Sequence, residues 1–348
     1  LTDDLLVSAA VRYDDYDGFG DTTNFKLAGN LRVTDTVRLR AAASTGFRAP
    51  SMQQLFFSNI STQFIGGVQI ETGTFRNDSE VAQAIGIPTL KEEESDNFSI
   101  GAIIDLADNW NLTIDLYSID IDDRIVLSNN LGSGLSPALD AALLATGSGG
   151  GQFFLNAIDT ETDGVDIVST YSDIEVGGGL LDLTFAANFT DTDIADIFSD
   201  SSPALTAIAP EDIFGGFQPS VIETWQPEER ISLIGRYVLD DWSFNLALQH
   251  YGEYTTVDTG SQTYGSELLT DLRIAYDFGN GVTANISGVN IFDVTPDEVT
   301  NSGSRGGNFE SAPGLEDLAS PTVFRYSRRS APFGFNGAYW SAGVNYSF

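Results

Sequence analysis

The sequence predicts an all-β protein, an antiparallel transmembrane β-barrel of which about twelve strands are present. Two patterns predict this fold: apolar residues occupy alternate positions in segments of roughly ten residues, and the connections between segments alternate between short and long. The composition agrees, with 35 Gly, 23 Phe and 12 Tyr against one His, one Met and no Cys. Aromatic residues are enriched in strands and glycine in turns, so this composition suits a sheet with many turns.

The predicted strands follow one another along the chain. In a representative segment, Phe25, Leu27 and Leu31 fall on one face, whereas Lys26 and Arg32 fall on the other. The segments cover residues 5–13, 25–33, 37–44, 98–106, 110–121, 164–171, 180–189, 230–239, 242–250, 268–278, 282–292 and 339–348. A tilted strand of about 9–11 residues crosses a bilayer, so each segment is predicted to span a membrane.

The connections predict how the barrel is inserted. Short connections lie at 34–36, 107–109, 172–179, 240–241 and 279–281, and long ones at 14–24, 47–96, 125–162, 190–228, 251–266 and 293–337. Outer-membrane barrels have short periplasmic turns and long extracellular loops, which predicts the outer membrane of a Gram-negative bacterium. One long loop contains a helical pattern at 136–146, in which Leu139, Leu143 and Leu144 share a face that we expect to pack.

Aromatic residues lie beside the short connections and at the C-terminus: Trp110, Trp242, Tyr276, Phe278, Tyr346 and Phe348. This placement predicts an interfacial aromatic girdle on the periplasmic side. The alternative is that they are ordinary core aromatics of a soluble sheet. No stretch of eighteen apolar residues occurs, which excludes a transmembrane helix. Residues 1–7 lack the features of a signal peptide, so we expect a mature exported chain or a fragment of one.

The charge is strongly acidic. Fifty acidic residues against 16 basic ones give a formal net charge of −34, which argues against a nucleic-acid partner. Solvated loops or a salty habitat explain this charge more simply than a dedicated cation-binding role. Seven basic residues are predicted to point into the barrel: Arg12, Lys26, Arg32, Arg38, Arg40, Arg236 and Arg273. They would form ion pairs with a plug or with opposing strands, or else line a path for an anionic solute.

No motif supports catalysis, a metal site or a cofactor. His250 is the single imidazole, at the extracellular end of a strand, and no nucleophile has a recognisable setting around it. The run 120–123 lacks the spacing of a calcium loop, and the glycine runs at 147–151 and 177–179 are not phosphate loops. In the last loop, Arg325, Arg328 and Arg329 are interleaved with Phe324 and Tyr326. Arginine with aromatics is the candidate site for a small-molecule ligand; solvation with local ion pairs is the alternative.

Several segments resemble the β-barrel of TonB-dependent receptors. Gly46, Phe47, Arg48, Ala49 and Pro50 match the GFRAPS segment, which ends a barrel strand and enters an extracellular loop. The other matching positions, in chain order, are Leu90, Glu93, Ser95, Asn97 and Gly101, then 112–125, then Asn156, Ala157, Gly164, Val165 and Asp166, then 288–293, and finally 333–348 with its terminal Phe348. The segment 288–293 is one residue shorter than the family pattern, which would shift a bulge.

The resemblance implies the second half of a barrel of about 22 strands. The family's plug, TonB box and first strands would then precede residues 1–348, which would all belong to the barrel domain. It further implies active import energised by TonB, with siderophores, vitamins, carbohydrates or metal chelates as cargo, lipid around the wall, and the barrel assembly machinery reading Phe348. The alternatives are a complete twelve-stranded barrel and a passive porin or adhesin-like barrel without a plug.

Overall fold

Twelve strands form one antiparallel sheet in the computed structural model, in the order β1-β2-β3-β6-β7-β10-β11-β12-β13-β16-β17-β18. The structure describes residues 4–16, 20–65, 68–146, 149–197, 205, 207–257, 260–299, 325–327 and 329–348. The strands are β1 Leu5–Tyr16, β2 Gly20–Arg32, β3 Val37–Arg48, β6 Glu93–Ala107, β7 Trp110–Leu127, β10 Phe154–Val176, β11 Gly179–Ile197, β12 Glu229–Leu239, β13 Trp242–Tyr251, β16 Glu267–Asp277, β17 Val282–Val289 and β18 Tyr339–Tyr346. All twelve predicted strands are confirmed.

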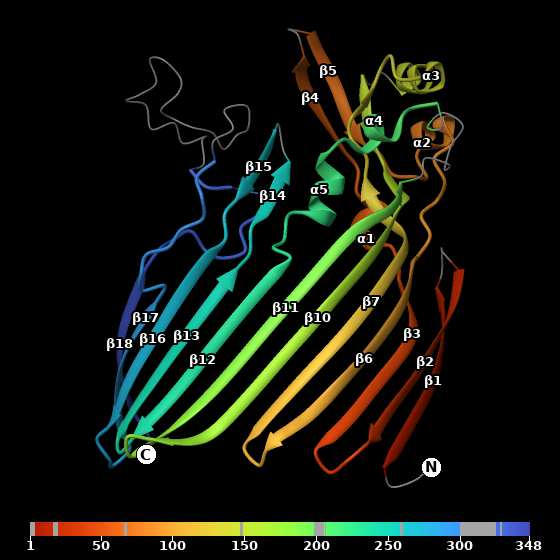
Figure 1. The fold of residues 1–348 in the computed structure, drawn as a ribbon. Coiled ribbons are helices and arrows are strands. Elements are labelled where there is room, and N and C mark those ends of the chain that lie inside the picture. The colour runs from red at the N-terminus through yellow and green to blue at the C-terminus, as the bar shows by residue number, and fades with distance from the viewer. Residues whose placement is uncertain are drawn as a thin grey trace, which may run out of the picture.

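The sheet is curved and open, with β1 and β18 at its two edges (Figure 1). Every neighbour in the sheet is the next long strand along the chain, which is the up-and-down order of a membrane barrel. Short turns lie at one end of the sheet, which we call the turn end. The helices and small sheets gather at the other end, which we call the mouth (Figure 1).

The short turns use residues that tolerate a left-handed backbone. Asp240 (φ 49°) joins β12 to β13, and Asn280 (φ 54°) lies between β16 and β17. Two of the predicted connections were wrong. Residues 14–24 are mostly paired strand, since Tyr16 already lies opposite Gly20. The turn predicted at 172–179 is confined to 177–178, because β10 continues past a register shift between Tyr171 and Ile174.

The central strands are longer than predicted at the mouth. β7 runs to Leu127 and β10 begins at Phe154, within the loop predicted at 125–162. This extension contains register shifts at Ile158 and buries Val126, Leu155 and Ile158 in the core of the loops, so packing at the mouth accompanies the pairing beyond the lipid-facing alternation. At the other extreme, β17 ends at Val289 and not at 292, because Asn290 turns (φ 51°) and its backbone N–H donates to Asp271.

The two faces of the sheet differ in chemistry. The outer face carries exposed alternate apolar residues, among them Leu27 (58% exposed), Phe98 (53%) and Val344 (73%). The six girdle aromatics lie at the turn end, where Trp242 contacts Tyr276 with ring centroids 4.7 Å apart. Such exposure is costly in water and favourable in hydrocarbon, so this face is suited to lipid. Within the described residues, no helix is long and apolar enough to cross a membrane.

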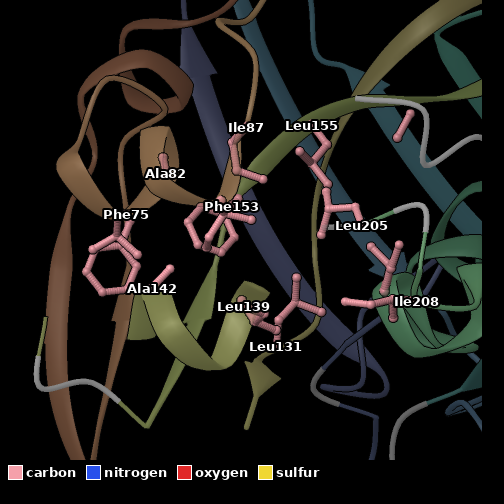
Figure 2. Packing of buried hydrophobic residues seen from close by; sticks show 14 of the residues in the cluster. Phe75, Ala82, Ile87, Leu131, Leu139, Ala142, Phe153, Leu155, Leu205 and Ile208 are labelled. Atoms are coloured by element: carbon pink, nitrogen blue, oxygen red, sulfur yellow. The ribbon is translucent and has the colours of Figure 1, made fainter. Parts of the chain in front are cut away.

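Three long loops share one buried core at the mouth. They contain the helices α1 Met52–Phe56, α2 Glu80–Ile85, α3 Pro137–Thr146, α4 Pro210–Phe214 and α5 Phe217–Glu223, and one small sheet of β4 Asn59–Ile65, β5 Val68–Thr74, β8 Leu131–Gly132 and β9 Gly150–Gln152. A fourth loop forms the separate hairpin β14 Tyr254–Val257 and β15 Ser261–Tyr264. Phe75, Leu139 and Leu205, one from each loop, point into this core (Figure 2). The helix predicted at 136–146 is confirmed, but Leu144 is 82% exposed, whereas Leu143 is 1% exposed.

Candidate functional site

Segments that are far apart in the sequence meet where β3, β6, β7 and β10 reach the mouth. Arg48, at the end of β3, donates from Nε to Glu93 at 2.6 Å and makes a second bond to the same carboxylate through Nη2. Glu93 is 5% exposed and also accepts the backbone N–H of Ile125 at 2.8 Å. A buried carboxylate needs such partners, so Glu93 joins three strands at one point.

The same junction continues into β10. The side chain of Asn156 joins two backbone segments. Its Nδ2 donates to the carbonyls of Lys91 and Asp123, and its Oδ1 accepts the backbone N–H of Lys91. Lys91 also forms an ion pair with Asp123. Burial lowers the pKa of Arg124, and the Glu93 carboxylate opposes this shift. The family-like segments therefore form a structural junction, which we call the motif junction.

Below the motif junction, two glycines allow side chains to cross the inner face. A Cβ on Gly101 would lie 2.0 Å from Asp115, the carboxylate that accepts from Arg40 Nε at 2.7 Å. A Cβ on Gly164 would lie 2.1 Å from the ring of Tyr117. Both positions therefore require glycine for close approach rather than for backbone freedom.

Tyr117 belongs to a polar network on the inner face. Its hydroxyl bonds to Thr190 and accepts from Asn188 Nδ2 at 3.2 Å, and the same amide donates to Asp166 at 2.8 Å. These side chains come from β7, β10 and β11, which the register places side by side. The network leads upward to a hollow at the mouth.

That hollow, which we call the vestibule pocket, has a volume of about 380 Å³. It lies between the inner face of β11–β13 and the segments that pass over it, and its lining includes Asn188, Thr190, Thr192, Glu223, Gln226, Glu228, Arg230, Tyr251 and Pro332. Arg230 lies over the Tyr251 ring, 5.0 Å from its centroid, and donates to its hydroxyl at 3.2 Å. A larger hollow of about 610 Å³ shares Thr190, Gln226 and Glu228 with it.

The predicted ligand residues of the last loop are only partly described. Phe324 and Arg328 lie outside the described residues. Arg325 donates to Glu298 at 2.6 Å and lies over Tyr326, and Arg329 lies over the Phe217 ring at 4.9 Å. Pro332 of the same loop lines the vestibule pocket. A ligand role for Arg325, Arg329 and Tyr326 remains a prediction, and these contacts are compatible with local structural roles.

The predicted inward basic residues lie on the inner face, and four form ion pairs within the wall. The pairs are Arg12 with Asp14, Arg38 with Asp105, Arg40 with Asp115 and Arg236 with Asp182. Lys26, Arg32 and Arg273 are exposed on that face. Ion pairing within the wall thus accounts for four of the seven: two pairs join neighbouring strands, Arg40 reaches across β6 to β7, and Arg12 pairs within β1.

His250 lies on the opposite, outer face, because it is two and four residues from Leu248 and Leu246 in β13 and therefore shares their face of the sheet. Its Nε2 lies 3.0 Å from a Glu229 carboxylate oxygen, which makes it one half of a local pair. Among the residues that the structure describes, no group of three or more His, Cys, Asp or Glu side chains could hold a metal ion.

The vestibule pocket was missed at the level of sequence. Asn188, Arg230 and Tyr251 meet because of strand register, and nothing in their local sequence marks them. The one signal available in the sequence was the face of the strand on which these residues fall. All three fall on the polar face of their strands, close to a long loop.

Comparison with known proteins identifies the family. The model of the TonB dependent receptor-like β-barrel matches residues 1–291. The chain is 26% identical over 292 residues to the heme/hemopexin utilization protein C of Haemophilus influenzae strain KW20, covering 78% of this chain and 35% of that protein. The same protein of strain 86-028NP is also 26% identical, over 286 residues. The chain thus spans about a third of the length of these curated relatives.

Solved structures show the same fold. A variant of the ferric enterobactin receptor PfeA of Pseudomonas aeruginosa matches with a TM-score of 0.59 at 15% identity, over 88% of this chain and 40% of that one. The siderophore receptor PirA of Acinetobacter baumannii matches with a TM-score of 0.59 at 16% identity, over 100% of this chain and 44% of that one. The chain therefore belongs to the TonB-dependent receptor-like β-barrels, a family of outer-membrane receptors of Gram-negative bacteria and not of enzymes.

Proposed function

We propose that this chain forms part of the wall and mouth of a receptor that imports an iron carrier, a siderophore or heme, with energy delivered through TonB. The relatives support this cargo class, since their names refer to heme utilization and to siderophore reception. Outer-membrane nutrient uptake in general follows from the family. The plug and the TonB contact are proposed to belong to parts of the receptor outside this chain.

The observation that carries the proposal is the vestibule pocket. It lies on the inner face at the mouth, where a ligand would arrive from outside, and its lining combines hydrogen-bond donors and acceptors with one aromatic ring, that of Tyr251, among the described residues. Arg230, the one basic side chain in its lining as far as the described residues go, is held against Tyr251. Pre-positioned polar groups of this kind fix the orientation of a bound small molecule.

A growth experiment tests the proposal. A strain lacking the receptor is complemented with the full-length receptor and supplied with hemin or with a ferric siderophore as the iron source. We expect Arg230→Ala to raise the concentration needed for half-maximal growth by about tenfold, the loss of one charged hydrogen-bonding group. Arg236→Ala is the matched control, because Arg236 lies on the same face of β12 but pairs with Asp182 near the turn end.

The outcome separates the alternatives. Growth on one iron source alone assigns the cargo to that carrier. Growth that persists without TonB would support a passive porin, and no effect of the receptor on either source would reject the iron-carrier proposal. Equal effects of the two arginine variants would reject the vestibule pocket as the ligand site while leaving uptake itself intact.

A further inference from the structure

An apolar groove crosses the outer face of β13, β16 and β17 close to the turn end. Its volume is about 400 Å³, within the range of pockets that hold small molecules. Its lining consists of residues from alternate positions, Trp242, Ile274, Tyr276, Phe278, Ala284 and Ile286, together with Asn285 between the last two. None of them is charged. The register sets Trp242 opposite Tyr276 and Tyr276 opposite Ala284, so the three lie in one row across the strands.

The groove exists because the rings in this row do not cover their neighbour. Trp242 is tilted by 56° against Tyr276, and Phe278 meets Tyr276 edge-on at 80°. Ala284, next in the row, has only a methyl group. The rings of Trp242, Tyr276 and Phe278 therefore lie on one side of Ala284, and the space over the Ala284 methyl group belongs to the groove.

A second girdle tryptophan shows the contrasting arrangement. Trp110, like Trp242, is the first residue of its strand and is similarly exposed, at 40% against 44%. Its ring lies nearly flat on Tyr171, at 16°, and its Nε1–H donates to Ser169 at 2.9 Å. Trp242 also stacks on a ring, that of Phe244 on its own strand, at 18°, but it is tilted against Tyr276 on the neighbouring strand and forms one wall of the groove.

We infer that this groove binds one acyl chain of a phospholipid from the periplasmic leaflet, as a tightly held lipid. The groove is continuous with the lipid-facing surface of an outer-membrane barrel, so its surroundings are hydrocarbon. Its uncharged lining suits a chain and not a headgroup. The adjoining turn residues, 240–241 and 279–281, place the headgroup at the membrane surface. The inference is independent of the cargo of the receptor.

Native mass spectrometry of the full-length receptor tests this inference. The receptor is released from its membrane in mild detergent, and retained phosphatidylethanolamine is counted. Ala284→Trp fills the groove and should lower the fraction carrying one retained lipid by about fivefold or more, because the indole displaces several methylene groups. Ala102→Trp is the matched control, because Ala102 also lies on the outer face at a similar distance from the turn end. Ala102 pairs with Leu39, which is the third residue of β3, and Ala284 is the third residue of β17.

A second pair of variants keeps the inference testable if a tryptophan insertion prevents assembly. Trp242→Ala should lower lipid retention, and Trp110→Ala should not. Equal retention in all variants, or equal loss in Trp242→Ala and Trp110→Ala, would overturn the inference and leave only a general interfacial girdle.

Discussion

Glu93 shows how one residue can hold several strands together. Its carboxylate is almost fully buried, yet it accepts hydrogen bonds from Arg48 on β3 and from the backbone of β7. Its neighbour Glu94 lies on the opposite face of β6 and is exposed. Two adjacent glutamates therefore have opposite environments, which provides a direct comparison.

We expect Glu93→Gln to destabilise the motif junction by about 1.5–3 kcal/mol, the value of hydrogen bonds to a charged group. Hydrogen exchange of the mouth ends of β3, β6 and β7 measures this loss, and Glu94→Gln should leave that exchange unchanged. The junction would not depend on Glu93 if the two variants exchanged alike.

Among the elements, α3 depends on which of two adjacent leucines faces the core. Leu143 is 1% exposed and Leu144 is 82% exposed, although the sequence pattern placed both on one face. Ala142 is buried in place of Leu144, because the helix turns by about 100° per residue and its buried stripe is narrow.

Leu143→Asp should unfold the shared loop core, since an unpaired buried carboxylate costs several kcal/mol. Leu144→Asp adds the same charge at the surface and should be tolerated. Limited proteolysis of the receptor reports the difference: rapid cleavage of the extracellular loops in Leu143→Asp only. Cleavage of both variants at the same rate would contradict the placement of α3.

The hairpin β14–β15 provides a pH-dependent element. Partial burial, and then the carboxylate of Asp297, raise the pKa of Glu267. Asp297 accepts the backbone N–H of Gly265 at 2.7 Å, next to the buried Tyr254–Tyr264 pair. A carboxyl with a raised pKa favours its protonated form when folded. Its contribution to stability is therefore present below the ordinary pKa and is lost as the pH rises through the raised value.

Hydrogen exchange of the paired residues 254–257 and 261–264 should accordingly become faster as the pH rises through this window, after correction for the intrinsic rate. Glu267→Gln should remove this dependence, because glutamine does not titrate. Glu253→Gln, at an exposed position on the same segment, serves as the control. Persistence of the dependence in Glu267→Gln would mean that another group causes it.

At the scale of the whole molecule, the acidic charge is organised in rows on the outer face near the mouth. Asp96 lies opposite Asp120, Asp120 opposite Glu161, and Glu161 opposite Asp193, so one row crosses four strands. Like charges directly opposite on a sheet repel one another. The net charge of −34 is thus partly concentrated where it acts against the fold.

Salt should therefore stabilise the receptor, since the screening length falls from about 30 Å at 0.01 M to about 10 Å at 0.1 M. Thermal unfolding in detergent at low and high NaCl measures the effect. Asp120→Asn with Glu161→Gln should raise the low-salt midpoint and flatten the salt dependence. A midpoint that does not respond to salt in the unchanged receptor would contradict this account.

The sequence predicted the number, order and faces of the strands because a lipid-facing wall imposes alternation at every span. It did not predict how far β7 and β10 extend, because beyond the membrane the strands pack against the loops, with Val126, Leu155 and Ile158 in the loop core, and an alternating lipid-facing pattern carries no information on that packing. The vestibule pocket could not be predicted, since Arg230 and Pro332 are adjacent only in the folded chain. The alternation of apolar residues thus predicts the barrel wall, whereas the vestibule pocket depends on strand register and loop packing, which the alternation does not contain.

The shared loop core has a consequence for exchanging loops between receptors. Phe75, Leu139 and Ile213 come from three separate loops, yet each completes the packing of the other two. A single transplanted loop would carry one third of an interior and expose the remainder to water. We therefore expect ligand specificity to be transferred to another receptor only when all three loops are exchanged together.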